Sequence, residues 1–586
     1  GDTMILQALA KYYETLVEED KVSKPGWCSA KVSYQIDLTK EGEVKGIICL
    51  KEENRGKKVV LAPKQLLVPE MVTRSSGVSS NFLCDNAKYL LGICQEDDEK
   101  NKKRAEDCFF AAKEKHLSFL KQAEGDMAKA ICLFFEKWNP KEAMNHPEIR
   151  ENWEEITDGG NLIFGIGMEF AQEDAEIREL WDDRVTDESE DAQGICLVTG
   201  EKTEIARIHR GIKGVPGAQS SGAALVSFNA SSFESYGKEQ SYNAPVGKYA
   251  EFAYTTALNY LLSDRTYSLQ IGDTMVVFWA ESGKTSYQDF FKMCTESPSD
   301  NQRELKEVFK KIQLGKPVIF KGNELDPEQR FYVLGLAPNV ARLSVRFFYE
   351  NSFGNILRNI SEHYKRMEII RPQWERKEFL SVREMLFETV NKNSKEKKPV
   401  PNMATMTFRA ILSGGRYPER LYSDTLIRIR AEQDDSKINW RRIAIIKTYL
   451  MHNCYWKEGE DYMGLNEESN DIAYVLGRLF SVLESIQLDA SPGVQATIRD
   501  RYYNSACGTP AAVFPILIKL KNSHMKKIGR EKEGTKKYYE KLFTEIMWKV
   551  DASEGFPKRL SLEQQGKFAI GYYHQTQKKY EKREEK

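Results

Sequence analysis

The residues best suited to recognition chemistry are gathered between Cys196 and Gly247. This segment is rich in glycine, and its stretch from Gln219 to Asn243 is dense in Gln, Ser, Asn and Tyr. Glycine allows tight backbone turns, while amide and hydroxyl side chains donate and accept hydrogen bonds. Arg207 and Lys213 precede the polar run. Such a loop suits a phosphate backbone and base edges, although a long surface loop of incidental polarity explains the same composition.

A second polar loop begins at Arg74 and runs through small polar residues and a glycine to Asn81 and Phe82. In one interpretation it enters a groove of DNA, because Asn can pair with adenine and Phe can wedge between base steps. In the other, Asp85 or Asn86 caps the next helix and Phe82 belongs to the core. We favour the core position for Phe82, because a Phe beside Leu is usually buried.

Basic residues are concentrated near the C-terminal end. Nine Lys and Arg stand against three Glu between Lys519 and Lys541, and Tyr538 and Tyr539 interleave with them. Positive charge with aromatic rings is what a single-strand track requires, although a solvated helix face is the usual interpretation of such a run. The whole chain is not basic, with 86 Lys and Arg against 87 Asp and Glu, so any nucleic-acid contact is expected to be local.

Signs of catalysis are weak. The segment Ala218–Gly222 resembles a nucleophile elbow around Ser220, but that motif needs a strand before it, and the preceding Lys-Gly-Val-Pro-Gly is not a central strand. The ten cysteines are dispersed and form no C-x-x-C pair. This pattern favours free thiols in a reducing cytoplasm over a zinc site. We therefore expect no enzymatic activity, metal or cofactor, and no apolar run reaches the roughly 20 residues of a membrane span.

The elements that must position these loops change in character along the chain. Apolar spacing predicts a helix at 4–18, and alternation predicts a hairpin at 32–50. Strand pairs are expected at 269–280 and at 331–349, the latter turning near residues 337–339 with Arg342 and Arg346 on one face. Beyond about residue 355 helical periodicity replaces the strand signals.

The sequence thus predicts an α+β fold, with a mixed N-terminal region containing antiparallel strand pairs and an all-helical C-terminal bundle. In that bundle, Ser469 or Asn470 is expected to cap a helix that carries a full apolar stripe. We expect three domains: an α+β domain at 4–375, a helical connecting region at 376–462 and a helical bundle at 463–586.

The chain also resembles the Csd-type large subunit of the subtype I-C CRISPR effector complex, the Cascade surveillance complex. The stretches that carry the resemblance are MILQALAKYYE, KPGWCSAKVSYQIDL, RSSGVSSNFLCDNAKYLLG, AEFAYTTALNYLL and FYVLGLAPNVARLSVRFF. The resemblance implies recognition of the target-flanking motif (PAM) in double-stranded DNA, help in unwinding, R-loop stabilisation and presentation of the site to a helicase-nuclease. The implied partners are crRNA, target DNA, the backbone and crRNA-end-capping subunits, and a separate small subunit whose internal start would be Met463.

Within this interpretation we assign two sets of contacts. The residues assigned to the DNA duplex and PAM are Arg74, Ser76, Asn81, Lys213, Gln219, Ser220, Asn229, Gln240 and Asn243. Those assigned to the displaced strand are Lys519, Lys526, Lys527, Arg530 and Lys537. Two alternatives from other classes are a hydrolase or nuclease centred on Ser220 and a purely structural scaffold subunit. The expected location is the cytoplasm.

Overall fold

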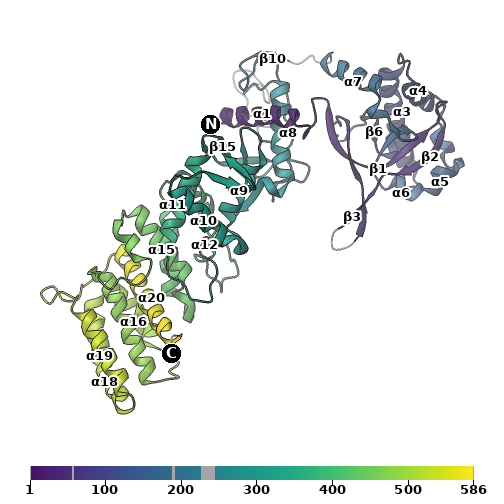
Figure 1. Ribbon diagram of the computed structural model, residues 1–586. Helices are drawn as coiled ribbons and strands as arrows, with labels where there is room; N and C mark the ends of the chain where they lie inside the picture. The colour runs from purple at the N-terminus through teal and green to yellow at the C-terminus, as the bar shows by residue number, and fades with distance from the viewer. Residues whose placement is uncertain are drawn as a thin grey trace. The chain divides into compact units, whose positions relative to one another are not determined.

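The computed structural model describes residues 2–55, 59–74, 76–187, 192–225, 244–400 and 402–584 (Figure 1). The chain divides into two compact units. The first consists of Gly1–Arg210 with Ser227–Ala257, and the second of Gly211–Val226 with Leu258–Lys586. Helix α8 (Lys248–Ser263) contributes residues to both units.

The first unit is built on a six-stranded mixed sheet, in which β1 pairs with β7 in parallel and the other pairs are antiparallel. Its path is β2-β1-β7-β6, with β5 on β1 and β8 on β7. Two short hairpins, β3–β4 and β9–β10, complete the strands of this unit. The strands are β1 (Trp27–Leu38), β2 (Val44–Cys49), β3 (Glu52–Arg55), β4 (Val59–Ala62), β5 (Lys64–Pro69), β6 (Cys84–Asp85), β7 (Asn161–Ile166), β8 (Glu169–Phe170), β9 (Gln193–Ile195) and β10 (Lys202–Glu204).

The predicted hairpin at 32–50 is confirmed, because Leu38 of β1 pairs with Val44 of β2. Its turn requires Gly42, whose φ is +81°. A Cβ atom added to Gly42 would lie only 2.6 Å from the amide nitrogen of Phe134. The predicted N-terminal helix is α1, and the other helices pack with the sheet around one aromatic core. The N-terminal helix is α1 (Asp2–Glu18), and those that pack with the sheet are α2 (Ala87–Leu90), α3 (Glu99–Leu120), α4 (Asp126–Lys137), α5 (Pro147–Glu151), α6 (Trp153–Thr157) and α7 (Ala175–Asp187).

The second unit begins with an antiparallel sheet of order β11-β12-β15-β16. Both predicted strand pairs are present, but the β15–β16 turn lies at residues 340–341 rather than 337–339, with Val340 at a φ of +56°. A β-bulge leaves Arg346 without a register partner and interrupts the alternation that was expected to place it with Arg342. The strands are β11 (Ser268–Ile271), β12 (Thr274–Ala280), β13 (Val318–Phe320), β14 (Asn323–Leu325), β15 (Arg330–Asn339) and β16 (Arg342–Ser352).

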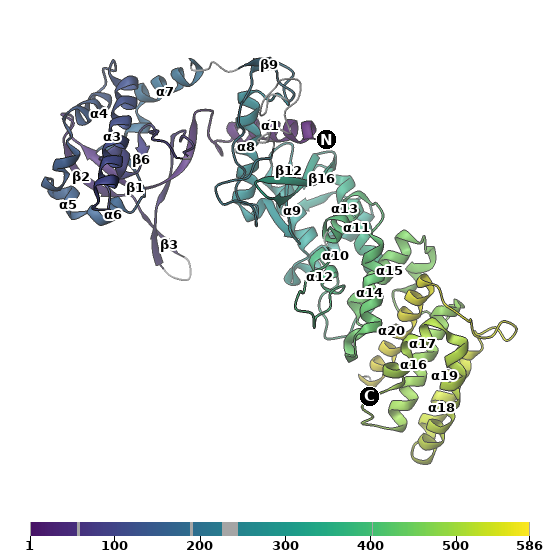
Figure 2. The ribbon, with the colours of Figure 1, turned by 180° about the vertical axis from the view of Figure 1, so that it is seen from behind.

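After β16 the described part of the chain contains helices and no further strand, as predicted (Figures 1 and 2). One hydrophobic core extends from the sheet at Leu269 to Tyr573 in the last helix. The α+β class is therefore confirmed, while the boundaries at 375/376 and 462/463 stay predictions. The helices are α9 (Thr285–Glu296), α10 (Gln302–Gln313), α11 (Phe353–Met367), α12 (Val382–Phe387), α13 (Met403–Ser413), α14 (Glu419–Ala431), α15 (Trp440–Asn453), α16 (Ile472–Ala490), α17 (Ile498–Gly508), α18 (Pro510–Glu531), α19 (Glu533–Met547) and α20 (Leu562–Glu584).

Helices α16 and α20 approach each other through glycines. A Cβ atom on Gly477 would overlap the Phe568 carbonyl, and one on Gly571 would overlap the Tyr474 carbonyl. The backbones can therefore touch only because both positions lack a side chain. The predicted cap of α16 was wrong by one or two residues: the cap is Asp471, whose carboxylate accepts from the amides of residues 473 and 474.

Candidate nucleic-acid interface

The part of the polar segment that belongs to the second unit is a closed loop at residues 211–225. Ile212 and Ala223 exchange two backbone hydrogen bonds of 2.8 and 2.9 Å, which draw the two ends of the loop together. Gly211 and Gly222 sit beside this bridge, and a Cβ on Gly222 would lie 2.9 Å from the Gly211 Cα. Gly222 also has a φ of +113°, so both its backbone angle and its surroundings require glycine.

This loop is anchored at both ends to regular elements of its own unit. Asn259 of α8 accepts from the Lys213 amide at 2.8 Å and donates to the Gly211 carbonyl at 3.2 Å. At the other end Ala224 bonds to the β15–β16 hairpin, accepting from the Leu343 amide at 3.0 Å. The loop backbone is therefore held in place without help from its own polar side chains.

Three of the assigned residues project from this loop. Lys213, Gln219 and Ser220 are exposed, and the Gln219 carbonyl accepts from the Gly222 amide at 3.0 Å. A fixed backbone that presents a cation, an amide and a hydroxyl to solvent can meet phosphate and base edges at little entropic cost. The assigned residues Asn229, Gln240 and Asn243 lie outside the described residues.

Ser220 does not occupy a nucleophile elbow. The residues before it form turns and the isolated bridge of Ile212 rather than a strand, and no helix follows directly. In the described part of the chain no histidine hydrogen-bonds to a serine or a carboxylate. The local geometry thus lacks the base and the strand–turn–helix context on which serine hydrolases depend.

The loop at 74–86 uses most of its polar atoms internally. Arg74 bonds to the Ser79 carbonyl at 2.6 Å and to both carboxylate oxygens of Asp85, while its guanidinium lies 3.9 Å from the centre of the Tyr89 ring. Asn81 is buried, and its side chain accepts from the Val72 amide at 2.8 Å. Arg74 and Asn81 therefore shape the loop.

Phe82 is fully buried, as we favoured, and Asn86 caps α2 by accepting from the amide of residue 88. Of the residues assigned to the duplex in this loop, Ser76 alone is exposed. The groove-wedge interpretation of Phe82 is thus wrong, because its ring stacks on Trp181 at 5.0 Å inside the first core.

A buried histidine closes the same loop from α3. His116 Nε2 accepts from the Leu83 amide at 2.9 Å, which leaves Nδ1 as the protonated nitrogen that donates to the Ala112 carbonyl at 2.6 Å. Burial lowers the pKa of His116 to about 4, so the ring is neutral at pH 7. Neutral His116 is therefore a structural hydrogen-bonding residue of the first unit.

The C-terminal basic run is divided between two helices that lie side by side, α18 and α19 (Figures 1 and 2). On α18, Lys519, Lys526 and Arg530 occupy positions i, i+7 and i+11, which share one stripe of a helix. All three are exposed, and none has an ion-pair partner among the described residues. We call these three residues the α18 stripe. Lys527, on the flank of this stripe, reaches Ser491 at 3.1 Å.

On α19 the cations are paired within the helix. Lys537 lies 3.2 Å from Glu533, Lys536 3.7 Å from Glu540 and Lys541 3.9 Å from Glu545. Tyr539, expected to interleave with them at the surface, is instead buried and bonded to Asp489, whereas Tyr538 is exposed. The unpaired positive charge is therefore concentrated on α18, which the sequence could not distinguish from α19.

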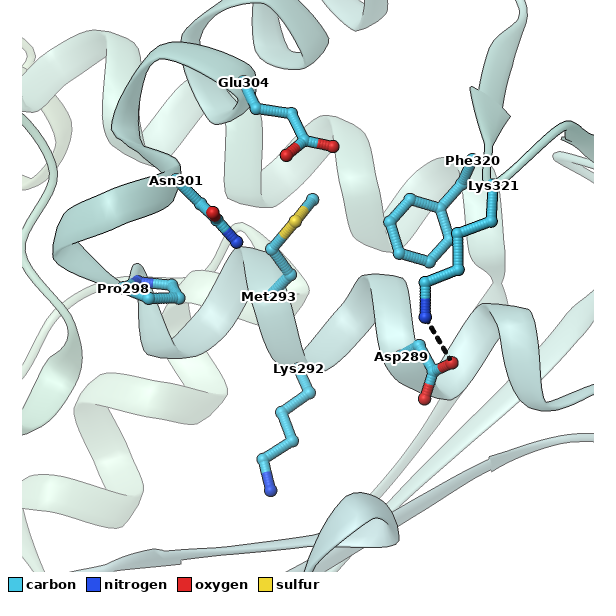
Figure 3. A pocket seen from close by; sticks show the side chains of 8 residues that line it. All are labelled: Asp289, Lys292, Met293, Pro298, Asn301, Glu304, Phe320 and Lys321. Atoms are coloured by element: carbon cyan, nitrogen blue, oxygen red, sulfur yellow. Dashed lines mark hydrogen bonds and ion pairs between the residues drawn. The ribbon is translucent and has the colours of Figure 1, made fainter.

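A cavity of about 510 Å³ beside α9 and α10 is lined by residues that include Asp289, Lys292, Glu304 and Lys321 (Figure 3). The Lys321 ammonium lies 3.3 Å from the Asp289 carboxylate, and Lys292 bonds to the Ser268 carbonyl at 3.2 Å. Lys321 and Asp289 thus neutralise each other at this opening.

Within the described ranges, no group of three or more His, Cys, Asp and Glu side chains is placed to hold a metal ion. Among the same residues, no helix combines the length and the apolarity needed to cross a bilayer. None of the ten cysteines, all of which lie among the described residues, forms a disulfide.

Met463, the predicted internal start, lies between the short 3-10 helix η8 (Lys457–Tyr462) and α16, and its carbonyl accepts from the Ile370 amide at 2.6 Å. Its use as a start codon stays a prediction. Sequence reasoning missed Asn259, which positions Lys213. The available signal was a lone Asn in the apolar helix Tyr-Thr-Thr-Ala-Leu-Asn-Tyr-Leu-Leu.

The comparisons with known proteins give one result. A family model described as CRISPR-associated protein (Cas_Csd1) matches residues 9–580, which is nearly the whole chain. A search of curated proteins finds no match. The match spans both compact units, including the 211–225 loop and the α18 stripe. The chain therefore belongs to the CRISPR-associated Cas_Csd1 family.

Proposed function

We propose that this chain is the large subunit of a subtype I-C Cascade complex, which recognises the PAM in double-stranded DNA, helps to unwind the duplex and stabilises the R-loop. It would present the opened site to the helicase-nuclease and break no covalent bond itself. In RNA-guided recognition, base pairing with the guide reads the sequence, so the protein needs only a short reader and phosphate contacts. Family membership supports this role, and the 211–225 loop carries the proposal at the residue level.

The loop supports duplex reading because Lys213, Gln219 and Ser220 are exposed on a backbone that Asn259 and the Ile212–Ala223 bridge hold. A cation can position the protein on a phosphate, and an amide can contact base edges. The α18 stripe supports displaced-strand binding, since its cations have no competing partner among the described residues.

The experiment compares two triple variants of the full chain in a reconstituted complex with crRNA. The first is K213A/Q219A/S220A, and the matched control is S299A/K310A/Q313A, which removes the same residue types from exposed positions of the same unit. We expect the loop variant to bind a PAM-containing target at least about tenfold more weakly, because each base contact contributes about 1–3 kcal/mol. Complex assembly should be unchanged.

Loss of assembly with normal DNA binding by the complexes that do form would favour the scaffold alternative. Turnover of a DNA or ester substrate by the purified chain, abolished by S220A, would favour the hydrolase alternative. Equal target affinity for both triple variants would remove the loop from the proposed interface.

A further inference from the structure

A second exposed feature lies in the connection between α11 and α12. Trp374 is 77% exposed there, beside exposed Gln373 and Arg376. A large indole in water is unfavourable by about 25 cal/mol for each Å² of apolar surface, so such a residue on a fixed loop calls for an explanation. We call residues 371–379 the Trp374 loop.

The Trp374 loop is held rigidly although it has no regular secondary structure. Arg371 donates to the Lys377 carbonyl at 2.9 Å, and the Lys377 amide donates to the Glu375 carboxylate at 2.9 Å. Trp440 of α15 donates its indole N–H to the same carboxylate at 3.1 Å. The loop therefore presents Trp374 without the ordering cost that a mobile segment would incur on binding.

The base of the loop is fixed by the buried side chain of Gln302. Its Oε1 accepts from the Glu378 and Phe379 amides, both at 2.9 Å, and the Phe379 carbonyl accepts from Ser297 at 2.8 Å. The loop thus rests on α9 and α10 at one end and on α15 at the other.

Of the three cations in the Trp374 loop, Arg371 and Lys377 are paired with carboxylates. Arg371 lies 2.9 Å and Lys306 3.1 Å from Glu378, while Lys377 lies 2.5 Å and Arg441 3.6 Å from Glu384. Among the described residues, Arg376 has no carboxylate partner. A nucleic-acid strand needs several available cations along its backbone, and the Trp374 loop offers one.

We propose that the Trp374 loop is a docking point for a protein subunit of the effector complex, one that offers an apolar pocket for the indole and a carboxylate for Arg376. Trp and Arg are the side chains that contribute most to binding at the centres of protein interfaces. Trp374 on its fixed loop, beside the unpaired Arg376, is such a pair of side chains. The inference rests on the proposed membership in a complex, but it is independent of how DNA is recognised.

The experiment reconstitutes the full chain with the backbone and end-capping subunits and crRNA, and measures the affinity of the chain for the rest of the complex. We expect Trp374→Ala to weaken incorporation by about 30-fold, the effect of losing an interface anchor. Arg376→Glu should weaken it more than Arg376→Ala, because reversal places two negative charges together. Trp548→Ala is the matched control, since Trp548 is also exposed in the same unit, and it should leave incorporation unchanged.

A photo-crosslinking amino acid at position 374 identifies what covers the loop. An adduct with a protein subunit is expected. An adduct with crRNA or DNA, or equal incorporation of Trp374→Ala and wild type, would overturn the inference while the proposed function stands. A wild-type chain that joins no such complex would contradict the proposed function, and the docking point with it.

Discussion

The guanidinium of Arg74 donates hydrogen bonds to both carboxylate oxygens of Asp85, with Nη1 3.0 Å from Oδ1, and lies over the ring of Tyr89. Asp85 is almost fully buried and also accepts from the amides of Asn81 and Asn86. Residue 74 therefore compensates a buried negative charge, which is a different task from the phosphate contact that its position in a polar loop suggested.

Replacement of Arg74 by Ala should destabilise the first unit. The change leaves the Asp85 carboxylate buried without its cation, and we expect the free energy of unfolding to fall by about 3 kcal/mol. Urea denaturation measures this loss. Ser76→Ala, at an exposed position of the same loop, is the control and should unfold as wild type does. A stable Arg74→Ala chain with weakened DNA binding would show that Arg74 contacts DNA after all.

The α18 stripe should determine the salt dependence of single-strand binding. Each neutralised phosphate of a single strand contributes about 0.7 to the slope of log K against log salt concentration, so K519A/K526A should lower the slope by about 1.4. The matched control is K536A/K541A on α19, whose ammonium groups pair with Glu540 and Glu545. Binding titrations of labelled DNA at several salt concentrations give both slopes, and equal slopes for the two variants would contradict the assignment.

The glycine contact between α16 and α20 gives a stability prediction. Gly571→Ala places a methyl group on the Tyr474 carbonyl, so the helices must separate and the free energy of unfolding should fall by about 3 kcal/mol. Gly534→Ala is the control, because Gly534 lies in α19 with open space around it. Alanine favours helix there by up to about 1 kcal/mol. If the midpoint of thermal unfolding of Gly571→Ala is equal to or higher than that of Gly534→Ala, α16 and α20 do not pack at this distance.

His116 should make the first unit sensitive to acid. Its pKa is about 4 in the folded chain and about 6.5 when unfolded, so between these values the unfolded chain binds the extra proton. The free energy of unfolding should therefore be greatest above pH 6.5, fall by roughly 3 kcal/mol as the pH is lowered to 4, and then level off for this group. His209 adds to the loss in the same unit, because burial lowers its pKa as well.

Denaturation at pH 7, 5.5 and 4.5 measures the effect of His116. His116→Gln should lower the free energy of unfolding at pH 7. It should also reduce the slope of that free energy against pH by close to the contribution of one bound proton. An unchanged slope in His116→Gln would mean that the pKa of His116 is the same in the folded and the unfolded chain.

Much of the architecture could be predicted because its signals are local. The hairpin at 32–50, the helix at 4–18 and the helical C-terminal region follow from hydrophobic periodicity, which reflects the burial of one face of an element. The family could be identified for a similar reason, since its characteristic stretches are contiguous. The exposed polar character of Gln219 and Ser220 likewise follows from a segment with too little apolar surface to be buried.

Tertiary structure alone decided which polar and charged side chains remain available. Arg74 and Asn81 had the composition of a DNA-binding loop, yet Asp85 and the Val72 amide occupy them. Lys519 and Lys537 belong to the same basic run, but only the latter has a glutamate on its own helix within 3.2 Å. The reason is physical: a charge or an amide is free to bind only if no partner folds against it, and sequence periodicity does not specify those partners.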